Sequence, residues 1–315
     1  MLSFLSFLLT LSLIKKEIFP KIKRIKVVAT GKNIRTFYKG NWHNEDVAIM
    51  KAADHGSWLG TTVFDGARHF EGVTPDLREH CIRVNNSAEA MMITPTVSED
   101  EMVQIVKEGL QEYSPNSAVY IRPMYWALEG DELAVVPKSG STGFAICLEE
   151  IPMSDLTATS TLTTTSFRRP VLQDNVVNAK AGCLYPNNAR MLVEAKSKGF
   201  GNALVADFAG NVAETATANI FMALDNEVFT PIPNGTFLAG ITRARHIKNF
   251  NDNGIIVHEK VLTFDDFNAA DEVFMSGNMK KVTPITAFDE VSYQTGPLTK
   301  MARDMYWDWA LSEKS

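Results

Sequence analysis

The sequence is poor in cysteine, with three in 315 residues, and the three lie far apart in the chain (Cys81, Cys147 and Cys183). An odd number at these spacings supports neither a disulfide framework nor a zinc site, and favours reduced thiols in a cytoplasmic protein. No glycine-rich dinucleotide motif or P-loop lysine follows a predicted strand, which argues against a nucleotide-binding fold. The net charge of −6 and the lack of a basic stripe with interleaved aromatic residues make nucleic acid an unexpected partner.

Long hydrophobic runs are also missing after the N-terminus. The apolar run at residues 2–14 is shorter than the roughly 18 residues of a membrane span. Its basic residues, from Lys15 to Lys26, follow the run, whereas a secretory signal carries them before it. We therefore predict that residues 1–30 are an extension outside the fold, either disordered or the product of a start codon assigned too early. An uncleaved membrane anchor is the alternative.

The remaining chain has the composition of a globular protein, 45% hydrophobic and 22% charged over the whole sequence, and is long enough for two packed lobes. The 137–141 stretch and the polar 157–165 region mark a change of character. We place a small N-terminal lobe at residues 31–155 and a larger C-terminal lobe at residues 156–315. Strands outnumber what regular βαβ units require, so the predicted fold class is α+β.

Hydrophobic periodicity and capping signals give the expected elements. Ser98 and Glu101 form a capping box that opens a helix. The expected helices cover residues 77–91, 99–110, 186–198, 242–253 and 297–311. The expected strands cover residues 37–50 (a pair turning at Gly40-Asn41), 118–128, 143–151, 203–207, 212–224, 255–259 and 272–275.

One lysine stands among small residues, in Asn178-Ala179-Lys180-Ala181-Gly182-Cys183-Leu184-Tyr185. A lysine that forms a Schiff base must lie where its ammonium is poorly solvated, so that the neutral amine is populated. The small neighbours leave room beside Lys180 for a flat aromatic cofactor. A solvated surface lysine is the ordinary alternative for such a segment taken alone.

Further segments supply what a phosphorylated pyridine cofactor needs. Glu214 ends the strand after the Ala209-Gly210-Asn211 turn, where a carboxylate would hold a proton on a pyridine nitrogen. Gly240-Ile241-Thr242 opens a helix whose free N–H groups and dipole form a phosphate seat, or Thr242 acts only as a cap. Asn278, in a polar turn, and the helical Arg78 would add donors to the same phosphate, although an ordinary loop and a surface arginine are the simpler readings.

Taken together and in this order, the segments resemble the class IV (fold type IV) pyridoxal-phosphate aminotransferases, most closely the branched-chain amino acid aminotransferases. The resemblance runs from about Gly40 to Trp309. The segments that carry it are Thr62-Val63-Phe64-Asp65-Gly66-Ala67-Arg68, Arg78-Glu79-His80, Val119-Tyr120-Ile121-Arg122-Pro123, Ala179-Lys180-Ala181-Gly182 with Tyr185, Gly210-Asn211-Val212-Ala213-Glu214, Asn219-Ile220-Phe221, Gly240-Ile241-Thr242-Arg243, Asp271-Glu272-Val273-Phe274-Met275-Ser276-Gly277 and Gly296-Pro297-Leu298-Thr299.

The resemblance implies a two-lobed fold like that of D-amino acid aminotransferase, with pyridoxal 5'-phosphate in the cleft between the lobes. Lys180 would carry the cofactor as a Schiff base and move the proton between Cα and C4′. Tyr185 would form a hydrogen bond with the phenolic oxygen of the cofactor ring. Glu214 would pair with the pyridine nitrogen. The phosphate contacts would be Arg78, Ile241, Thr242 and Asn278. A homodimer is also implied, in which the partner helps to close the pocket.

The implied reaction moves an amino group from a branched-chain or other hydrophobic L-amino acid to 2-oxoglutarate. Phe64 would line the side-chain pocket, while Tyr120, Arg122 and Arg68 are the candidate substrate contacts. The sequence departs from the branched-chain pattern at Leu59, at residues 132–136, at residues 148–152 and at Asn278-Met279.

These departures keep other readings of the same fold open: a D-amino acid or (R)-amine transaminase, or an aminodeoxychorismate lyase. A non-catalytic vitamin-binding protein is the reading from another class. A non-catalytic role does not explain why Lys180 and Glu214 occur in the same chain as two predicted phosphate-binding segments.

Overall fold

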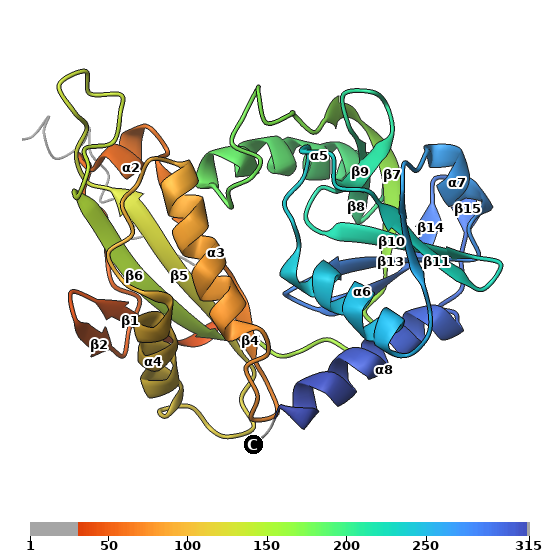
Figure 1. The fold of residues 1–315 in the computed structure, drawn as a ribbon, viewed down its shortest axis with the longest axis horizontal. Coiled ribbons are helices and arrows are strands. Elements are labelled where there is room, and N and C mark those ends of the chain that lie inside the picture. The colour runs from red at the N-terminus through yellow and green to blue at the C-terminus, as the bar shows by residue number, and fades with distance from the viewer. Residues whose placement is uncertain (1–30, 314–315) are drawn as a thin grey trace, which may run out of the picture. The chain divides into compact units, whose positions relative to one another are not determined.

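Residues 31–313, which the computed structural model of the protein describes, form two β-sheets with helices packed beside them (Figure 1). The predicted N-terminal extension, residues 1–30, lies outside the described residues. None of the helices in residues 31–313 is both long and apolar enough to cross a membrane.

The first sheet, in the described chain, has six strands in the order β2-β1-β6-β5-β3, with β4 paired to β5. All its pairs are antiparallel, and β5 and β6 pair along their full lengths. The strands are β1 (Lys32–Tyr38), β2 (Asn41–His43), β3 (Thr62–Phe64), β4 (Ala67–His69), β5 (Val119–Ala127) and β6 (Thr142–Glu150). The short helix α2 (His55–Trp58) lies beside β5.

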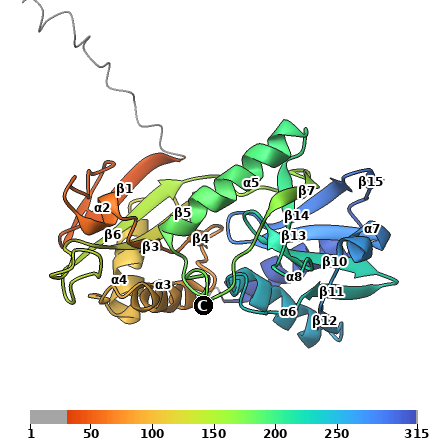
Figure 2. The ribbon, with the colours of Figure 1, turned by 90° about the horizontal axis from the view of Figure 1, so that it is seen from above.

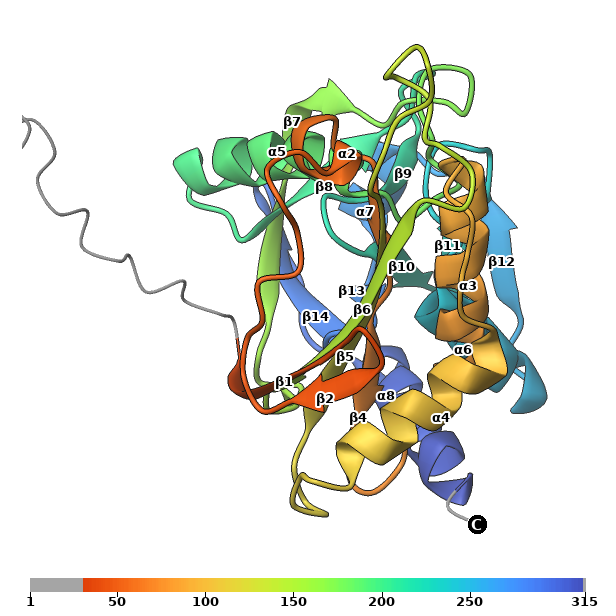
Figure 3. The ribbon, with the colours of Figure 1, turned by 90° about the vertical axis from the view of Figure 1, so that its left-hand side faces the viewer.

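Two helices cover one face of this sheet, α3 (Leu77–Ala90) and α4 (Glu99–Leu110), as Figure 3 shows. The predicted capping box is present: Ser98 and Glu101 each accept a hydrogen bond from the other's backbone N–H. Helical spacing in the sequence predicts one apolar face of α3, formed by Leu77, Cys81, Val84 and Ala88. This face is buried, with the last three at most 1% exposed. These side chains pack on Ile121 and Ile146 of the sheet in one hydrophobic core.

The second sheet has nine strands within the described residues, in the order β12-β11-β10-β13-β14-β7-β8-β9, with β15 paired to β14. It mixes parallel pairs, such as β7 with β8, with antiparallel pairs, such as β13 with β14. The strands are β7 (Ser160–Arg168), β8 (Asn202–Ala206), β9 (Val212–Thr215), β10 (Asn219–Leu224), β11 (Glu227–Pro231), β12 (Val257–Lys260), β13 (Glu272–Gly277), β14 (Lys281–Phe288) and β15 (Val291–Ser292). The α+β prediction is confirmed.

Helices pack around this sheet as well. Helix α5 (Tyr185–Ser197), which follows the short η1 turn (Gly182–Leu184), lies alongside β7 and β8 (Figure 2). Helices α6 (Ile241–Asp252) and α8 (Pro297–Ser312) contact each other and β13, and α7 (Phe264–Ala269) packs into the core through Phe267.

Three of the differences from the sequence prediction concern the larger lobe predicted at residues 156–315. The polar 157–165 region, predicted as a boundary, overlaps the first part of strand β7, and the predicted 212–224 strand is two strands, β9 and β10. Helical spacing predicts Leu298, Met301, Met305 and Trp309 as the buried face of α8. Leu298 is buried, but Met301 is 37% exposed, while Ala302 and Tyr306 are at most 1% exposed. The buried face is therefore rotated toward Thr299, Ala302, Tyr306 and Ala310.

The first sheet lies within residues 32–150 and the second within residues 160–292. By their backbone contacts the residues from Gly31 onward group as one unit. The lobe boundary at residue 155 therefore stays a prediction.

Candidate active site

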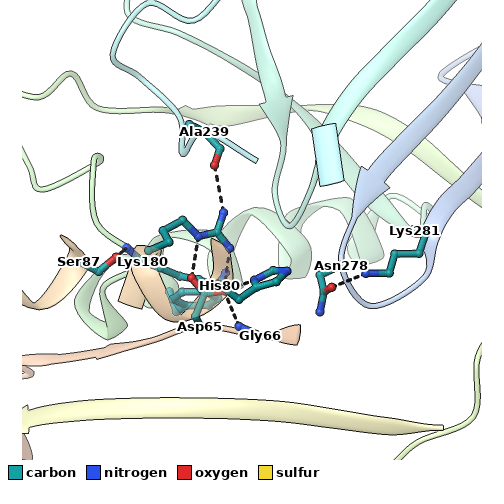
Figure 4. Close-up of polar contacts among 10 residues, drawn as sticks. Asp65, Gly66, His80, Ser87, Lys180, Ala239, Asn278 and Lys281 are labelled. Carbon is teal, nitrogen blue, oxygen red and sulfur yellow. Dashed lines mark hydrogen bonds and ion pairs between the residues drawn. The ribbon is translucent and has the colours of Figure 1, made fainter. Parts of the chain in front are cut away.

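Lys180 lies in an extended segment whose backbone is held by α3 on one side and β3 on the other. Its backbone N–H donates to Ser87 Oγ of α3 at 3.0 Å, and its carbonyl oxygen accepts from Phe64 N of β3 at 3.1 Å (Figure 4). Its neighbours Ala179 and Ala181 are buried in the core and line the same cavity as Lys180. Gly182 serves packing and not the cavity, because a Cβ there would lie 2.3 Å from Thr62 Oγ1.

The side chain of Lys180 reaches Tyr185 at the start of α5. Nζ donates to Tyr185 Oη at 2.7 Å and lies 4.8 Å from the centre of the Phe64 ring. Burial lowers the pKa of Lys180, but Tyr185 and Asp65 raise it, and the net pKa is above its usual value. This direction favours the ammonium in the unliganded site over the neutral amine expected from the sequence, because Tyr185 and Asp65 together outweigh the desolvation.

Glu214 lies on β9 and is buried, with one oxygen 3.1 Å from Arg169 Nε. Its other oxygen accepts from Asn219 Nδ2 at 3.3 Å. Burial raises the pKa of Glu214, while Arg169 and Lys180 lower it, and the net pKa is above its usual value. A carboxyl tuned in this way can share a proton with a basic ring nitrogen.

The N-terminus of α6 opens on the same cavity through Gly240, Ile241 and Thr242. No side chain caps this end, so the first N–H groups of the helix stay available to an anion. Gly240 is required here, since a Cβ would lie 1.9 Å from Asn219 Oδ1.

Arg83 of α3 also lines the cavity, and Arg78 does not. The Arg78 side chain is 49% exposed and pairs with Glu99 at 3.1 Å and Asp100 at 3.2 Å. The prediction that Arg78 binds the phosphate is therefore wrong. Arg83 contacts the α6 end of the cavity by donating to Ala239 O at 3.0 Å.

A buried carboxylate orients Arg83. Asp65 Oδ2 is 2.6 Å from Arg83 Nε, and Asp65 Oδ1 is 2.6 Å from His80 Nδ1 (Figure 4). Burial alone would raise the pKa of Asp65, but Arg83 and His80 hold it well below its usual range. Burial lowers the pKa of His80 despite Asp65, which favours a neutral imidazole.

Helix geometry explains why Arg83 was missed. At about 100° per residue, Arg78 and Arg83 lie about 140° apart on α3, whereas His80, Arg83 and Ser87 share one flank. The sequence contains this polar flank beside the apolar stripe. The family resemblance favoured Arg78 because that arginine stands directly within the Arg78-Glu79-His80 segment.

The end of β13 and the turn after it supply another wall of the cavity, with Ser276 and Asn278 respectively. Ser276 Oγ, Asn278 Nδ2 and His80 Nε2 are buried and have no hydrogen-bond partner within residues 31–313. Unpaired buried polar atoms are unfavourable by about 1–3 kcal/mol each, so their convergence on one cavity indicates a polar ligand. These residues fit a phosphorylated cofactor.

Of the four predicted substrate contacts, Phe64 and Tyr120 line the cavity and the two arginines do not. Arg68 is fully buried and donates to Ile151 O and to the sulfur of Met153, which lowers its availability to a substrate. Arg122 is paired with the buried Glu149. The predicted substrate contacts of Arg68 and Arg122 are thus not supported, because both guanidinium groups are bonded inside the protein.

The cavity has a volume of about 300 Å³. It brings together eight of the predicted site residues: Phe64, Tyr120, Lys180, Tyr185, Glu214, Ile241, Thr242 and Asn278. Among the lining residues that sequence reasoning did not assign to the site are His80, Arg83, Arg169 and Asn219. It has walls from both sheets.

Comparison with known proteins identifies the class. Residues 62–288 match the family Amino-transferase class IV. The chain is 30% identical to the branched-chain-amino-acid aminotransferase of Escherichia coli strain K12, over 84% of this chain and 88% of that protein. An aminotransferase of Brucella abortus bound to the cofactor PLP is 57% identical, with a TM-score of 0.87 over 88% of this chain and 99% of that one.

A further solved structure is a branched-chain amino acid aminotransferase (T.th.) complexed with N-(5'-phosphopyridoxyl)-L-glutamate. It is 27% identical, with a TM-score of 0.79 over 87% of this chain and 93% of that chain. The chain belongs to the class IV aminotransferases. The sequence prediction of a transaminase that uses pyridoxal phosphate is confirmed.

Proposed function

We propose that this protein transfers the amino group of a branched-chain or other hydrophobic L-amino acid to 2-oxoglutarate, with Lys180 as the covalent attachment point of the cofactor. The observation that carries the proposal is the placement of Lys180, Glu214 and the N-terminus of α6 around one cavity. An amine, a ring-nitrogen partner and an anion seat are the three contacts that pyridoxal phosphate requires.

When bound, the cofactor supplies an electron sink for the pair left on the substrate when its Cα–H bond breaks. Lys180 Nζ, released when the substrate amine replaces it, accepts the Cα proton and returns it to the reacting carbon of the cofactor. Tyr185 Oη orients Nζ throughout, since the two atoms lie 2.7 Å apart. Glu214, fixed by Arg169 and Asn219, keeps a proton on the ring nitrogen.

The phosphate would be held by the N–H groups of Ile241 and Thr242, the Thr242 hydroxyl and the Asn278 amide. Arg83 takes the place predicted for Arg78. Burial raises the pKa of Tyr120, so its phenol stays protonated and can donate to a substrate carboxylate.

The substrate assignment draws on the relatives. The E. coli protein is a branched-chain enzyme, and the T.th. enzyme holds an adduct of glutamate, the amino form of 2-oxoglutarate. The apolar side chains of Phe64 and Leu184 in the cavity wall suit an aliphatic donor.

One observation favours an (R)-amine transaminase as the second candidate, ahead of a D-amino acid transaminase, whose substrate carries a carboxylate. Among the described residues that line the cavity, Arg83 and Arg169 are both paired with carboxylates, and Arg122 and Arg68 are absent. A donor without a carboxylate would fit such a wall. The related lyase would release product from one substrate without any acceptor.

A half-reaction screen tests the proposal. The purified protein is mixed with single L-amino acids, D-amino acids or chiral amines while the visible band of the cofactor is followed. Bleaching by L-leucine, L-isoleucine or L-valine and recovery with 2-oxoglutarate are expected. Bleaching only by (R)-amines would replace the proposal with the second candidate, and bleaching only by D-amino acids would replace it with a D-amino acid transaminase.

We also propose a homodimer, two lobes at residues 31–155 and 156–315, and a cytoplasmic location. The 129–141 loop supports the dimer because it exposes Leu133 (76%) and Val135 (68%), which a partner would cover. Three free cysteines within residues 31–313 are consistent with a reducing compartment. Light scattering of the purified chain would test the dimer.

A further inference from the structure

Lys281 is an unusual residue in the second sheet. It is the first residue of β14, directly after the turn that carries Asn278, and its side chain is 0% exposed. Its backbone φ is +65°, in the left-handed region that side chains other than glycine rarely adopt. Strain of this kind, together with a buried lysine, persists only where the surroundings enforce it and is concentrated at functional sites.

The buried amine has no carboxylate partner among the described residues. Asp76, the acid that most affects it, is paired with Arg245 at 2.6 Å. The contacts of Lys281 Nζ are Asn278 Oδ1 at 2.5 Å and the Tyr306 ring, whose centre lies 5.1 Å away. Burial lowers the pKa of Lys281 to about 7, with Asp76 raising it and Arg68 lowering it further. An apolar residue would avoid this desolvation.

The hydrogen bond to Asn278 fixes the direction of the amide. Below its pKa the lysine is an ammonium with three donors and no acceptor, so the amide oxygen faces Lys281, as the Nζ–Oδ1 contact shows, and the NH₂ group faces away. Figure 4 shows Lys281 reaching Asn278 from the β14 side. Asn278 lines the cavity, and its Nδ2 is buried without a partner within residues 31–313. The donor end is therefore presented to whatever anion the cavity binds.

We propose that Lys281 is a positioning residue that locks the Asn278 amide so that its N–H donors point at the cofactor phosphate. The inference rests on the proposed function, because that function places the phosphate between Asn278 and the start of α6. It adds that Lys281, which does not line the cavity, determines whether Asn278 presents its amide NH₂ group or its oxygen to the cavity.

The test compares two forms of one cofactor. Full-length apoenzyme, prepared by dialysis against an amino donor, is titrated with pyridoxal phosphate and with pyridoxal, which lacks the phosphate. Lys281→Met should weaken pyridoxal phosphate binding about fivefold to fiftyfold, somewhat less than the roughly tenfold to hundredfold loss of one whole hydrogen bond to a charged group, because the amide remains and loses only its fixed orientation. Pyridoxal affinity should change less than twofold. Lys280→Met, at the neighbouring partly exposed lysine, should match wild type in both titrations.

A double-mutant cycle separates positioning from stability. If Lys281 acts through Asn278, adding Lys281→Met to Asn278→Ala should change pyridoxal phosphate affinity by less than twofold. If the two substitutions instead weakened pyridoxal phosphate binding independently, so that their fold losses multiplied in the double variant, that result would overturn the proposal. So would equal losses for pyridoxal and pyridoxal phosphate, or an effect confined to the KM of the amino acid, which would assign the amide to the substrate carboxylate.

A variant that leaves Lys281 intact protects the test against misfolding. Asn278→Asp keeps an oxygen facing Lys281 but turns a carboxylate toward the phosphate, so its loss should exceed that of Asn278→Ala. Wild-type affinity in Asn278→Asp would refute the proposal. Failure of the proposed function can be told apart from failure of this inference, because the wild-type protein would then form no covalent link to the cofactor at Lys180.

Discussion

Replacing Glu149 by glutamine should make the enzyme a better user of 2-oxoglutarate. Glu149 is 2% exposed on its side chain and pairs with Arg122, whose side chain is 27% exposed. Glutamine keeps an oxygen for Gly31 N, which lies 3.0 Å from Glu149 Oε2. The guanidinium, which lies 5.2 Å from the ring centre of the cavity residue Tyr120, would then carry an uncompensated charge.

The magnitude follows from the bond that Arg122 would gain. A hydrogen bond to a charged group contributes about 1.5–3 kcal/mol, equivalent to about tenfold or more in kcat/KM for the acceptor with a distal carboxylate. Stability should fall by less than the roughly 3–5 kcal/mol typical of breaking a fully buried pair, because Arg122 reaches solvent.

The assay measures kcat/KM for 2-oxoglutarate and for pyruvate, which has no second carboxylate, with one amino donor. Glu149→Gln should raise the ratio of kcat/KM for 2-oxoglutarate to kcat/KM for pyruvate about tenfold. Glu150→Gln, at the neighbouring carboxylate, should leave this ratio unchanged. Arg122→Met should leave it within about twofold of wild type. A tenfold drop in Arg122→Met would refute the reasoning, since it would mean that Arg122 already binds the distal carboxylate.

The remaining predictions concern the cofactor and pH. Arg83→Met should weaken pyridoxal phosphate binding about tenfold to hundredfold, whereas Arg78→Met should stay within twofold, as measured by titration of the apoenzyme. The reverse order would restore Arg78 to the site. The folded state holds the Lys281 pKa at about 7 against an ordinary value of 10.5, so it binds fewer protons than the unfolded chain between these limits. The stability of wild type relative to Lys281→Met should therefore rise by about 1 kcal/mol per pH unit from pH 7 to pH 9 in urea unfolding, and a flat difference would contradict the burial argument.

Local signals made much of the fold predictable. The capping box at Ser98 located the start of α4, and the apolar stripe of α3 located the buried face. The polar strand β7 was not predictable in this way. It gives only Leu162 and Phe167 to the hydrophobic clusters, and its threonines are held by pairing with β8 and β14.

Site residues that stand in a recognisable sequence motif could be predicted from the sequence. Residues whose role depends on a partner distant in the chain could not. Lys180 and Glu214 stand in distinctive segments. The exclusion of Arg122 depends on Glu149, a residue 27 positions away that reaches it only because β5 and β6 pair in register. Charge neutralisation across a sheet leaves no local pattern in the chain.

Borohydride reduction of the holoenzyme, followed by peptide mapping, tests the central claim most directly. The account predicts a single pyridoxyl group on the ε-nitrogen of Lys180. In Lys180→Ala, both this group and the turnover of substrate should be lost. A pyridoxyl group on another lysine, such as the buried Lys281, or continued turnover by Lys180→Ala would contradict it.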